Sequence, residues 1–240
     1  MNQPLWTPDA ARVADTLIDR FRQAVGVDGG YPDLHRWSVD HPADFWRAAW
    51  DHLDVVGDPG STALASDGSG HLTGTRFFPD GHLNFAENLL GTADDRPALV
   101  FRGEDPEVPG ARRTLTRRDL HHLVSRLQQA MLDLGVEPGD RVAAWMPNVP
   151  ETCAVMLAAA SIGATFSSTS PDFGASGVID RFGQIRPVLL FAADGYRYGG
   201  RRHDVTGRLA EVAGALPDLR RLVVVPEDPS AGPVGALPDG

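Results

Sequence analysis

From residue 97 onward, short apolar runs alternate with longer segments of helical periodicity, and this alternation constrains the fold more than any other feature. The expected strands lie at residues 98–101, 113–116, 141–146, 164–168, 188–192 and 222–225, and the expected helices at 117–134, 150–162, 175–184 and 203–216. Strands that are joined by helices run parallel, and a parallel sheet needs helices over both faces. The sequence therefore predicts an α/β fold in which residues 96–225 form a parallel-sheet subdomain that begins near residue 98.

The first 95 residues have a different character. Apolar spacing predicts helices at 8–25, 42–53 and 84–90, and a Gly/Ser/Asp-rich composition predicts a loop at 57–75. We expect residues 1–95 to form an N-terminal helical cap. The Pro- and Gly-rich stretch 226–240 is expected to be a loop at a truncation point, because a parallel sheet is not expected to stop at residue 225. The parallel-sheet subdomain is therefore expected to be incomplete.

Composition excludes several classes of function. All 22 basic residues are arginines, so Schiff-base chemistry and a lysine-containing P-loop are excluded. The 32 acidic residues leave a net charge of −10, which argues against a nucleic-acid-binding surface. The single cysteine, Cys153, excludes an internal disulfide and a cysteine-rich zinc site, and it fits a reducing, cytoplasmic location. The neighbouring His121 and His122 lack partners at ligand spacing, so no metal site is expected. The longest apolar run, residues 153–160, is too short to cross a membrane.

The region around residue 150 carries the most specific pattern. It contains Gly135-Val136, Gly139-Asp140-Arg141-Val142, Met146-Pro147-Asn148 and Ile162-Gly163-Ala164. This arrangement resembles the acyl-adenylate-forming ligases, which include the acyl-CoA synthetases. The matching residues are scaffold residues: glycines turn the chain, and small side chains let a helix lie close to the sheet. The resemblance therefore concerns the fold more than the active site.

Narrower features resemble the acetoacetyl-CoA synthetase branch of these ligases. They are the sequences WSV at 37–39, FW at 45–46, LNFAENLL at 83–90, SPDFG at 170–174 and GVIDRFGQIRP at 177–187. Relatives that act on acetate or propionate usually have a GGF-like element where this chain has Pro171-Asp172-Phe173. The resemblance extends from about residue 6 to residue 225, and the N-terminal portion is similar to the cap shared with acetyl-CoA synthetases.

The resemblance implies a two-step reaction. ATP and acetoacetate give an acyl-adenylate and pyrophosphate with the help of Mg²⁺, and CoA then displaces AMP. In this family the phosphate loop with its lysine, the residues that bind the ribose and the catalytic lysine lie further along the chain. The only similar stretch here, Ser167–Ser170, lacks glycine and lysine. The resemblance therefore implies an N-terminal portion that is inactive alone, has no catalytic residue or metal ligand of its own, and needs the remainder of the ligase as its partner.

One element is expected to contact a ligand. In acetyl-CoA synthetases an RGGR-like turn contacts the nucleotide end of CoA, and Tyr198-Gly199-Gly200-Arg201 lies where that turn falls. Glycines let the backbone approach a ligand, and a guanidinium binds phosphate through two hydrogen bonds. Arg201 matches the second arginine, Tyr198 replaces the first, and Arg197 is a possible substitute for it. The alternative is a solvated turn.

Three functions remain open from the sequence. The first is the N-terminal portion of an acetoacetate–CoA ligase. The second is a non-catalytic module, derived from the family, that binds CoA or a protein. The third is a ligase for another short-chain acid. Residues beyond Gly240 would separate the first two, and the acid is not readable here because the acyl pocket of the family lies mainly in later segments.

Overall fold

The computed structural model describes residues 5–228 and divides the chain into two compact units, Met1–Leu83 and Asn84–Gly240. Each unit has its own secondary structure and is described by itself. The expected loop at 226–240 lies outside the described residues from 229 onward.

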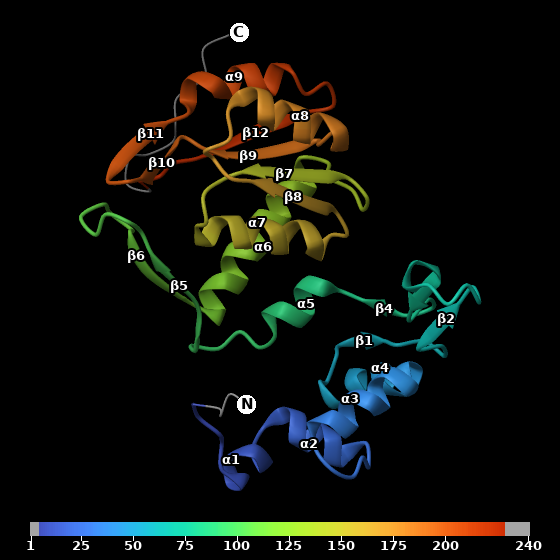
Figure 1. The fold of residues 1–240 in the computed structure, drawn as a ribbon. Coiled ribbons are helices and arrows are strands. Elements are labelled where there is room, and N and C mark those ends of the chain that lie inside the picture. Colours follow the sequence, from blue (N-terminus) through green and yellow to red (C-terminus); the bar gives the residue numbers. More distant parts are fainter. Residues whose placement is uncertain (1–4, 229–240) are drawn as a thin grey trace. The chain divides into compact units, whose positions relative to one another are not determined.

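Helices dominate the first unit (Figure 1). They are α1 (Ala10–Ala14), α2 (Leu17–Ala24), α3 (Tyr31–Asp40) and α4 (Pro42–His52). The single helix predicted at 8–25 is wrong, because the chain breaks at Asp15 and Thr16. Thr16 has an extended backbone, and its hydroxyl accepts a hydrogen bond from the Asp19 amide at 3.3 Å, which starts a new helix.

The core of the first unit is small. Its buried apolar residues are Phe21, Leu34 and Trp50, and the rings of Phe21 and Phe45 meet edge to face at 5.7 Å. The segment predicted as a loop at 57–75 contains short elements that local composition did not indicate. These are β1 (Gly57–Asp58), β2 (Leu64–Ser66) and a 3₁₀ turn η1 (Leu72–Gly74); β1 pairs with β4 (His82–Leu83) and β2 with β3 (Thr75–Phe77).

The second unit is the predicted α/β body. Its elements are α5 (Phe85–Leu90), β5 (Pro97–Arg102), β6 (Arg112–Thr116), α6 (Arg117–Asp133), β7 (Arg141–Trp145), α7 (Pro150–Ser161), β8 (Thr165–Thr169), α8 (Ala175–Ile185), β9 (Leu189–Ala193), β10 (Gly195–Tyr198), β11 (Arg201–Asp204), α9 (Thr206–Gly214) and β12 (Arg221–Val225). Side-chain caps start two of these helices: Asn84 accepts from the Ala86 amide at 3.0 Å at the start of α5, and Thr116 forms a capping box with Asp119 at the start of α6.

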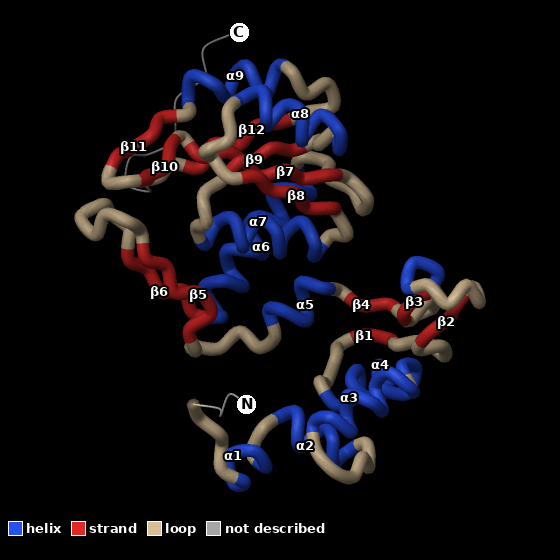
Figure 2. The backbone as a smooth tube through the Cα atoms, in the orientation of Figure 1, coloured by secondary structure: helices blue, strands red, loops and turns tan. Residues whose placement is uncertain are grey.

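A four-stranded parallel sheet forms the centre of this unit, with the strand order β12-β9-β7-β8. Helices α6 and α7 cover one face, and α8 and α9 cover the other (Figures 1 and 2). Two apolar clusters correspond to these faces: one includes Met131 and Val155, and the other includes Val178 and Leu209. Almost all of β7 and all of β9 are buried, as a sheet covered on both faces requires. The predicted fold class is confirmed.

Two details of the strand prediction are wrong. Strand β5 does not begin the parallel sheet; it pairs with β6 in an antiparallel hairpin, because residues 103–111 are too few to make a parallel crossover. The helix predicted at 203–216 begins only at Thr206, since residues 201–204 form β11 and pair with β10. Tyr198 lies opposite Arg201, so Gly199 and Gly200 form a two-residue hairpin turn with φ values of 61° and 73°. Such a turn requires positive φ at both positions, which glycine supplies.

Candidate functional site

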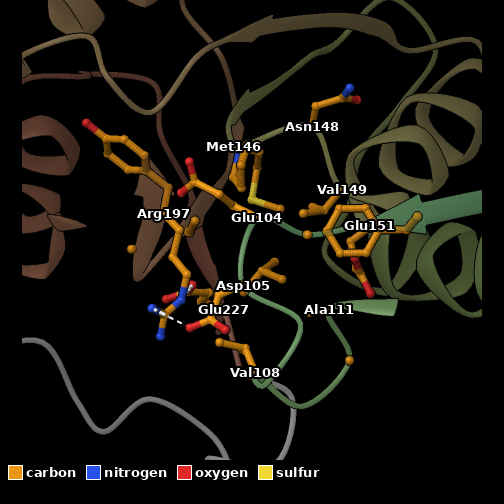
Figure 3. Close-up of a pocket in the computed structure, with 18 of the residues that line it drawn as sticks. Glu104, Asp105, Val108, Ala111, Met146, Asn148, Val149, Glu151, Arg197 and Glu227 are labelled. Atoms are coloured by element: carbon orange, nitrogen blue, oxygen red, sulfur yellow. Dashed lines mark ion pairs between the residues drawn. The ribbon is translucent and has the colours of Figure 1, made fainter. Parts of the chain in front are cut away.

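A cavity of about 250 Å³ lies at the carboxyl ends of three parallel strands of the second unit (Figure 3). Residues that follow β7, β9 and β12 form one part of its lining, and the β5–β6 hairpin forms another. Among the lining residues are Phe101, Val108, Met146, Val149, Ala193, Tyr196 and Val225. Ligands of open α/β sheets bind outside the carboxyl ends of the strands. The cavity therefore occupies the place where such a fold binds ligands.

An ion pair between Arg113 and Glu151 joins the β5–β6 hairpin to helix α7 beside this cavity. The Arg113 guanidinium donates two hydrogen bonds to the Glu151 carboxylate, at 2.5 and 2.9 Å, and lies over the Phe101 ring at 5.4 Å from its centroid. Burial is the largest single influence on the Glu151 carboxyl and raises its pKa, but the hydrogen bonds from Arg113, the backbone amide of Glu151 and the Arg113 charge together hold the pKa below its ordinary value. Glu151 therefore stays ionised, and its ion pair with Arg113 holds strand β6 against helix α7 at the wall of the cavity.

Arg197 is held between two acids at the other end of the cavity. Its guanidinium lies 3.3 Å from Asp105 Oδ2 and 2.9 Å from Glu227 Oε1. Figure 3 shows these three side chains close together. Asp105 belongs to the β5–β6 loop, residues 103–111, and Glu227 follows β12. Arg197 therefore links the β5–β6 loop to the carboxyl end of the sheet, and its charge is already compensated within the chain.

The glycine turn, Gly199-Gly200, is also contacted by the β5–β6 loop. The Gly199 amide donates to Glu104 Oε1 at 3.0 Å, and the Gly200 amide donates to Glu104 Oε2 at 3.3 Å. One carboxylate thus binds both amides of the turn. Arg201 follows directly, is exposed, and forms no ion pair within residues 5–228.

The structure brings all five residues of the predicted contact onto one hairpin, but it gives them different surroundings. Arg201 points a free charge at solvent beside the turn, Tyr198 is 75% exposed, and Arg197 is paired. Sequence reasoning missed Glu104 and Asp105. Glu104 and Asp105 lie in the connection between the strands expected at 98–101 and 113–116, and nothing in the spacing of this connection indicates that Glu104 contacts a residue 95 positions away.

Two kinds of group that metal binding and adenylation commonly use are absent: metal-ligand clusters among residues 5–228, and lysines in the chain as a whole. No group of three His, Cys, Asp or Glu side chains within residues 5–228 is arranged to hold a metal ion. The chain also has no lysine that would contact a triphosphate. In the same described range, none of the helices combines the length and the apolar character needed to cross a membrane.

Two family models match the chain. The model of the AMP-binding enzymes matches residues 85–235, and the model of the acetyl-coenzyme A synthetase N-terminus matches residues 31–89.

Among curated proteins, the chain is similar to the acetoacetyl-coenzyme A synthetase of Rhizobium meliloti (strain 1021), with 48% identity over 219 residues, which cover 89% of this chain and 33% of that protein. It is 40% identical to the acetoacetyl-CoA synthetase of Macaca fascicularis over 93% of this chain and 34% of that one. A malonamoyl-CoA synthetase of Penicillium aethiopicum is 36% identical over 92% of this chain and 31% of its own length.

Among solved structures, the acetoacetyl-CoA synthetase from Streptomyces lividans matches with a TM-score of 0.87 and 39% identity, over 98% of this chain and 36% of that one. The chain thus spans about a third of the length of these relatives.

Proposed function

Because the chain belongs to the family of AMP-binding enzymes, we propose that it is the N-terminal portion of an ATP-dependent ligase that joins acetoacetate to CoA. The observation that carries this proposal is the 48% identity with an acetoacetyl-coenzyme A synthetase over 89% of the chain. The reaction proposed for the whole ligase converts acetoacetate, ATP and CoA into acetoacetyl-CoA, AMP and pyrophosphate.

In this proposal the chain supplies scaffold and a contact for CoA, while adenylation depends on later segments. The parallel sheet fixes the cavity, and the Arg113–Glu151 and Arg197–Asp105 pairs fix the β5–β6 hairpin beside it. The amides of the glycine turn and the Arg201 guanidinium are the groups with which this chain would hold a phosphate of CoA. Mg²⁺, when bound, would neutralise charge on the phosphates of ATP, but no step through it is assigned to this chain.

A chimera tests the proposal. Residues 1–240 would replace the N-terminal third of the Rhizobium meliloti synthetase, and acetoacetate-dependent ATP–pyrophosphate exchange would be measured. We expect exchange within about tenfold of the parent enzyme, a difference of roughly 1.4 kcal/mol in barrier. A chimera that melts cooperatively but shows no exchange would favour the non-catalytic CoA- or protein-binding module.

A second candidate is a ligase for another short-chain acid. The 36% identity with a malonamoyl-CoA synthetase supports it, because the name of that relative indicates an acid other than acetoacetate. Substrate competition in a ligase that carries this chain with its own continuation would separate the two acids.

A further inference from the structure

The glycine turn has the geometry of an anion site. Gly199 and Gly200 both have positive φ, at 61° and 73°, and successive amides in such turns form concavities that bind anions. Both amides are already used in this structure, because the two oxygens of the Glu104 carboxylate accept one hydrogen bond each, at 3.0 and 3.3 Å. An anion therefore occupies the site, and the chain itself provides it.

The cations around the turn do not neutralise that anion. Arg197 is paired with Asp105 and Glu227, and none of the ion pairs within residues 5–228 includes Glu104 or Arg201. Glu104 and Arg201 are both exposed. Within residues 5–228 the Glu104 carboxylate accepts hydrogen bonds only from two neutral amides, so its release to water costs little.

A phosphate group at the same position would make more interactions than the carboxylate makes. It would accept hydrogen bonds from the two amides that now donate to Glu104, and it would add a charge-assisted hydrogen bond from Arg201, directly after the turn. The carboxylate and the phosphate are both negative and need the same two donors. They therefore exclude each other.

From this geometry we propose that the Glu104 carboxylate competes with a phosphate of CoA for the Gly199 and Gly200 amides. The β5–β6 loop thereby lowers the affinity of the turn for CoA, and CoA binds only when it displaces the Glu104 side chain. The proposal rests on the CoA contact proposed above for this turn. The Asp105–Arg197 pair keeps the loop close to the hairpin, so that only the Glu104 side chain must leave. If Glu104 fills the turn for roughly 80–90% of the time, the apparent affinity falls about five- to tenfold.

The test uses the 240-residue chain with ¹⁵N-labelled glycine. The amide resonances of Gly199 and Gly200 would be followed during titration with CoA and, separately, with inorganic phosphate. Glu104→Gln removes the charge of the competitor, and Glu107→Gln is the matched control. Glu107 lies in the same loop, and its exposed side chain forms no ion pair or hydrogen bond among the described residues.

We expect Glu104→Gln to move both glycine resonances without ligand and to bind CoA about five- to tenfold more tightly than the unmodified chain, whereas Glu107→Gln should change the affinity less than about twofold. Glu104→Ala should show the same gain as Glu104→Gln, and a thermal melt of each variant would verify the fold. Unchanged or weaker CoA binding in both Glu104 variants would overturn the proposal, as would resonances that CoA moves in none of the proteins.

This outcome is separable from the proposed function. ATP–pyrophosphate exchange with acetoacetate precedes the entry of CoA, so a failed glycine titration leaves exchange intact. Conversely, a chimera without exchange leaves the competition at the turn measurable in the isolated chain.

Discussion

Arg197 and Arg201 lie four residues apart on one hairpin, but the structure gives them different tasks. Arg197 lies between Asp105 and Glu227, where it ties the hairpin to its neighbours. Arg201 is exposed beside the glycine turn and forms no ion pair in the described part of the chain. Because the Arg201 guanidinium is not engaged in an ion pair within the described residues, we propose that Arg201, and not Arg197, binds a phosphate of CoA.

Replacing Arg201 by alanine should weaken the second half-reaction only. In the chimera, Arg201→Ala should raise the KM for CoA, because losing a charge-assisted contact costs about 1.5–3 kcal/mol, or roughly ten- to a hundredfold in affinity. ATP–pyrophosphate exchange should be nearly unchanged. Lysine should restore part of the affinity, since it keeps the charge but loses the planar fork.

The matched control is Arg208→Ala, which removes an exposed arginine on α9 that forms no ion pair among residues 5–228. An unchanged CoA dependence in Arg201→Ala would contradict the assignment. If exchange and thioester formation fell together, Arg201 would be holding the fold instead of the ligand.

The Arg113–Glu151 pair should make stability depend on pH. Arg113→Ala leaves the Glu151 carboxylate three-quarters buried without its partner, at an expected cost of about 1–3 kcal/mol at neutral pH. Because the pKa of Glu151 is lowered in the folded chain, the contribution of the pair is fully present above the ordinary value of 4.5 and is lost as pH falls through the folded pKa.

Urea unfolding of the unmodified chain and of Arg113→Ala, at neutral pH and in acid, measures this effect. The difference in the free energy of unfolding should shrink in acid. Arg112→Ala is the control, because Arg112 is the exposed neighbour on β6 and forms no ion pair in the described residues. A difference that is independent of pH would show that Arg113 acts through packing on Phe101.

At the scale of elements, the sequence predicted what depends on local signals. Helix α6 begins at Arg117 because Thr116 and Asp119 form a capping box, and β7 and β9 consist mostly of apolar residues between turns. Both hairpins of the site were missed as such. The pairing of β5 with β6 depends on the length of their connection, and β11 reads as the start of a helix until its pairing with β10 is known.

For the candidate site, too, the sequence predicted the part that a local motif marks and not the part that depends on long-range contacts. The motif at residues 198–201 identified the glycine turn, since two glycines and an arginine are visible in any sequence. The contact with Glu104 was not predictable, because it joins two loops through backbone amides that carry no sequence signal. Long-range polar contacts of this kind depend on the tertiary structure and leave no local pattern in the sequence.

Helix α7 should tolerate no larger side chain on its buried face. Ala158 is fully buried in the cluster between α6, α7 and the sheet, so Ala158→Leu should lower the free energy of unfolding by about 1–3 kcal/mol through overpacking. The same substitution at Ala130, an exposed position of α6, should change it by less than about 0.5 kcal/mol. Urea denaturation measures both, and equal effects would contradict the close packing of α7.

As a whole, the described part of the molecule provides a scaffold and lacks the groups that adenylation requires. The described part contains a sheet, a cavity and a glycine turn, whereas the chain has no lysine and residues 5–228 contain no group of three side chains arranged to hold a metal ion. We therefore expect the 240-residue chain alone to release no pyrophosphate from ATP with Mg²⁺ and acetoacetate. Release above a control without protein, dependent on acetoacetate, would show that adenylation needs none of the later segments.

The central claim is that this chain serves as the N-terminal third of an acetoacetate–CoA ligase, and acetoacetyl-CoA formation by the chimera tests it most directly. Thioester and AMP would be quantified together at varied CoA concentration. We expect both products to form in equal amounts, at a rate within about tenfold of the parent enzyme. A folded chimera that exchanges pyrophosphate but forms no thioester at any CoA concentration would contradict it.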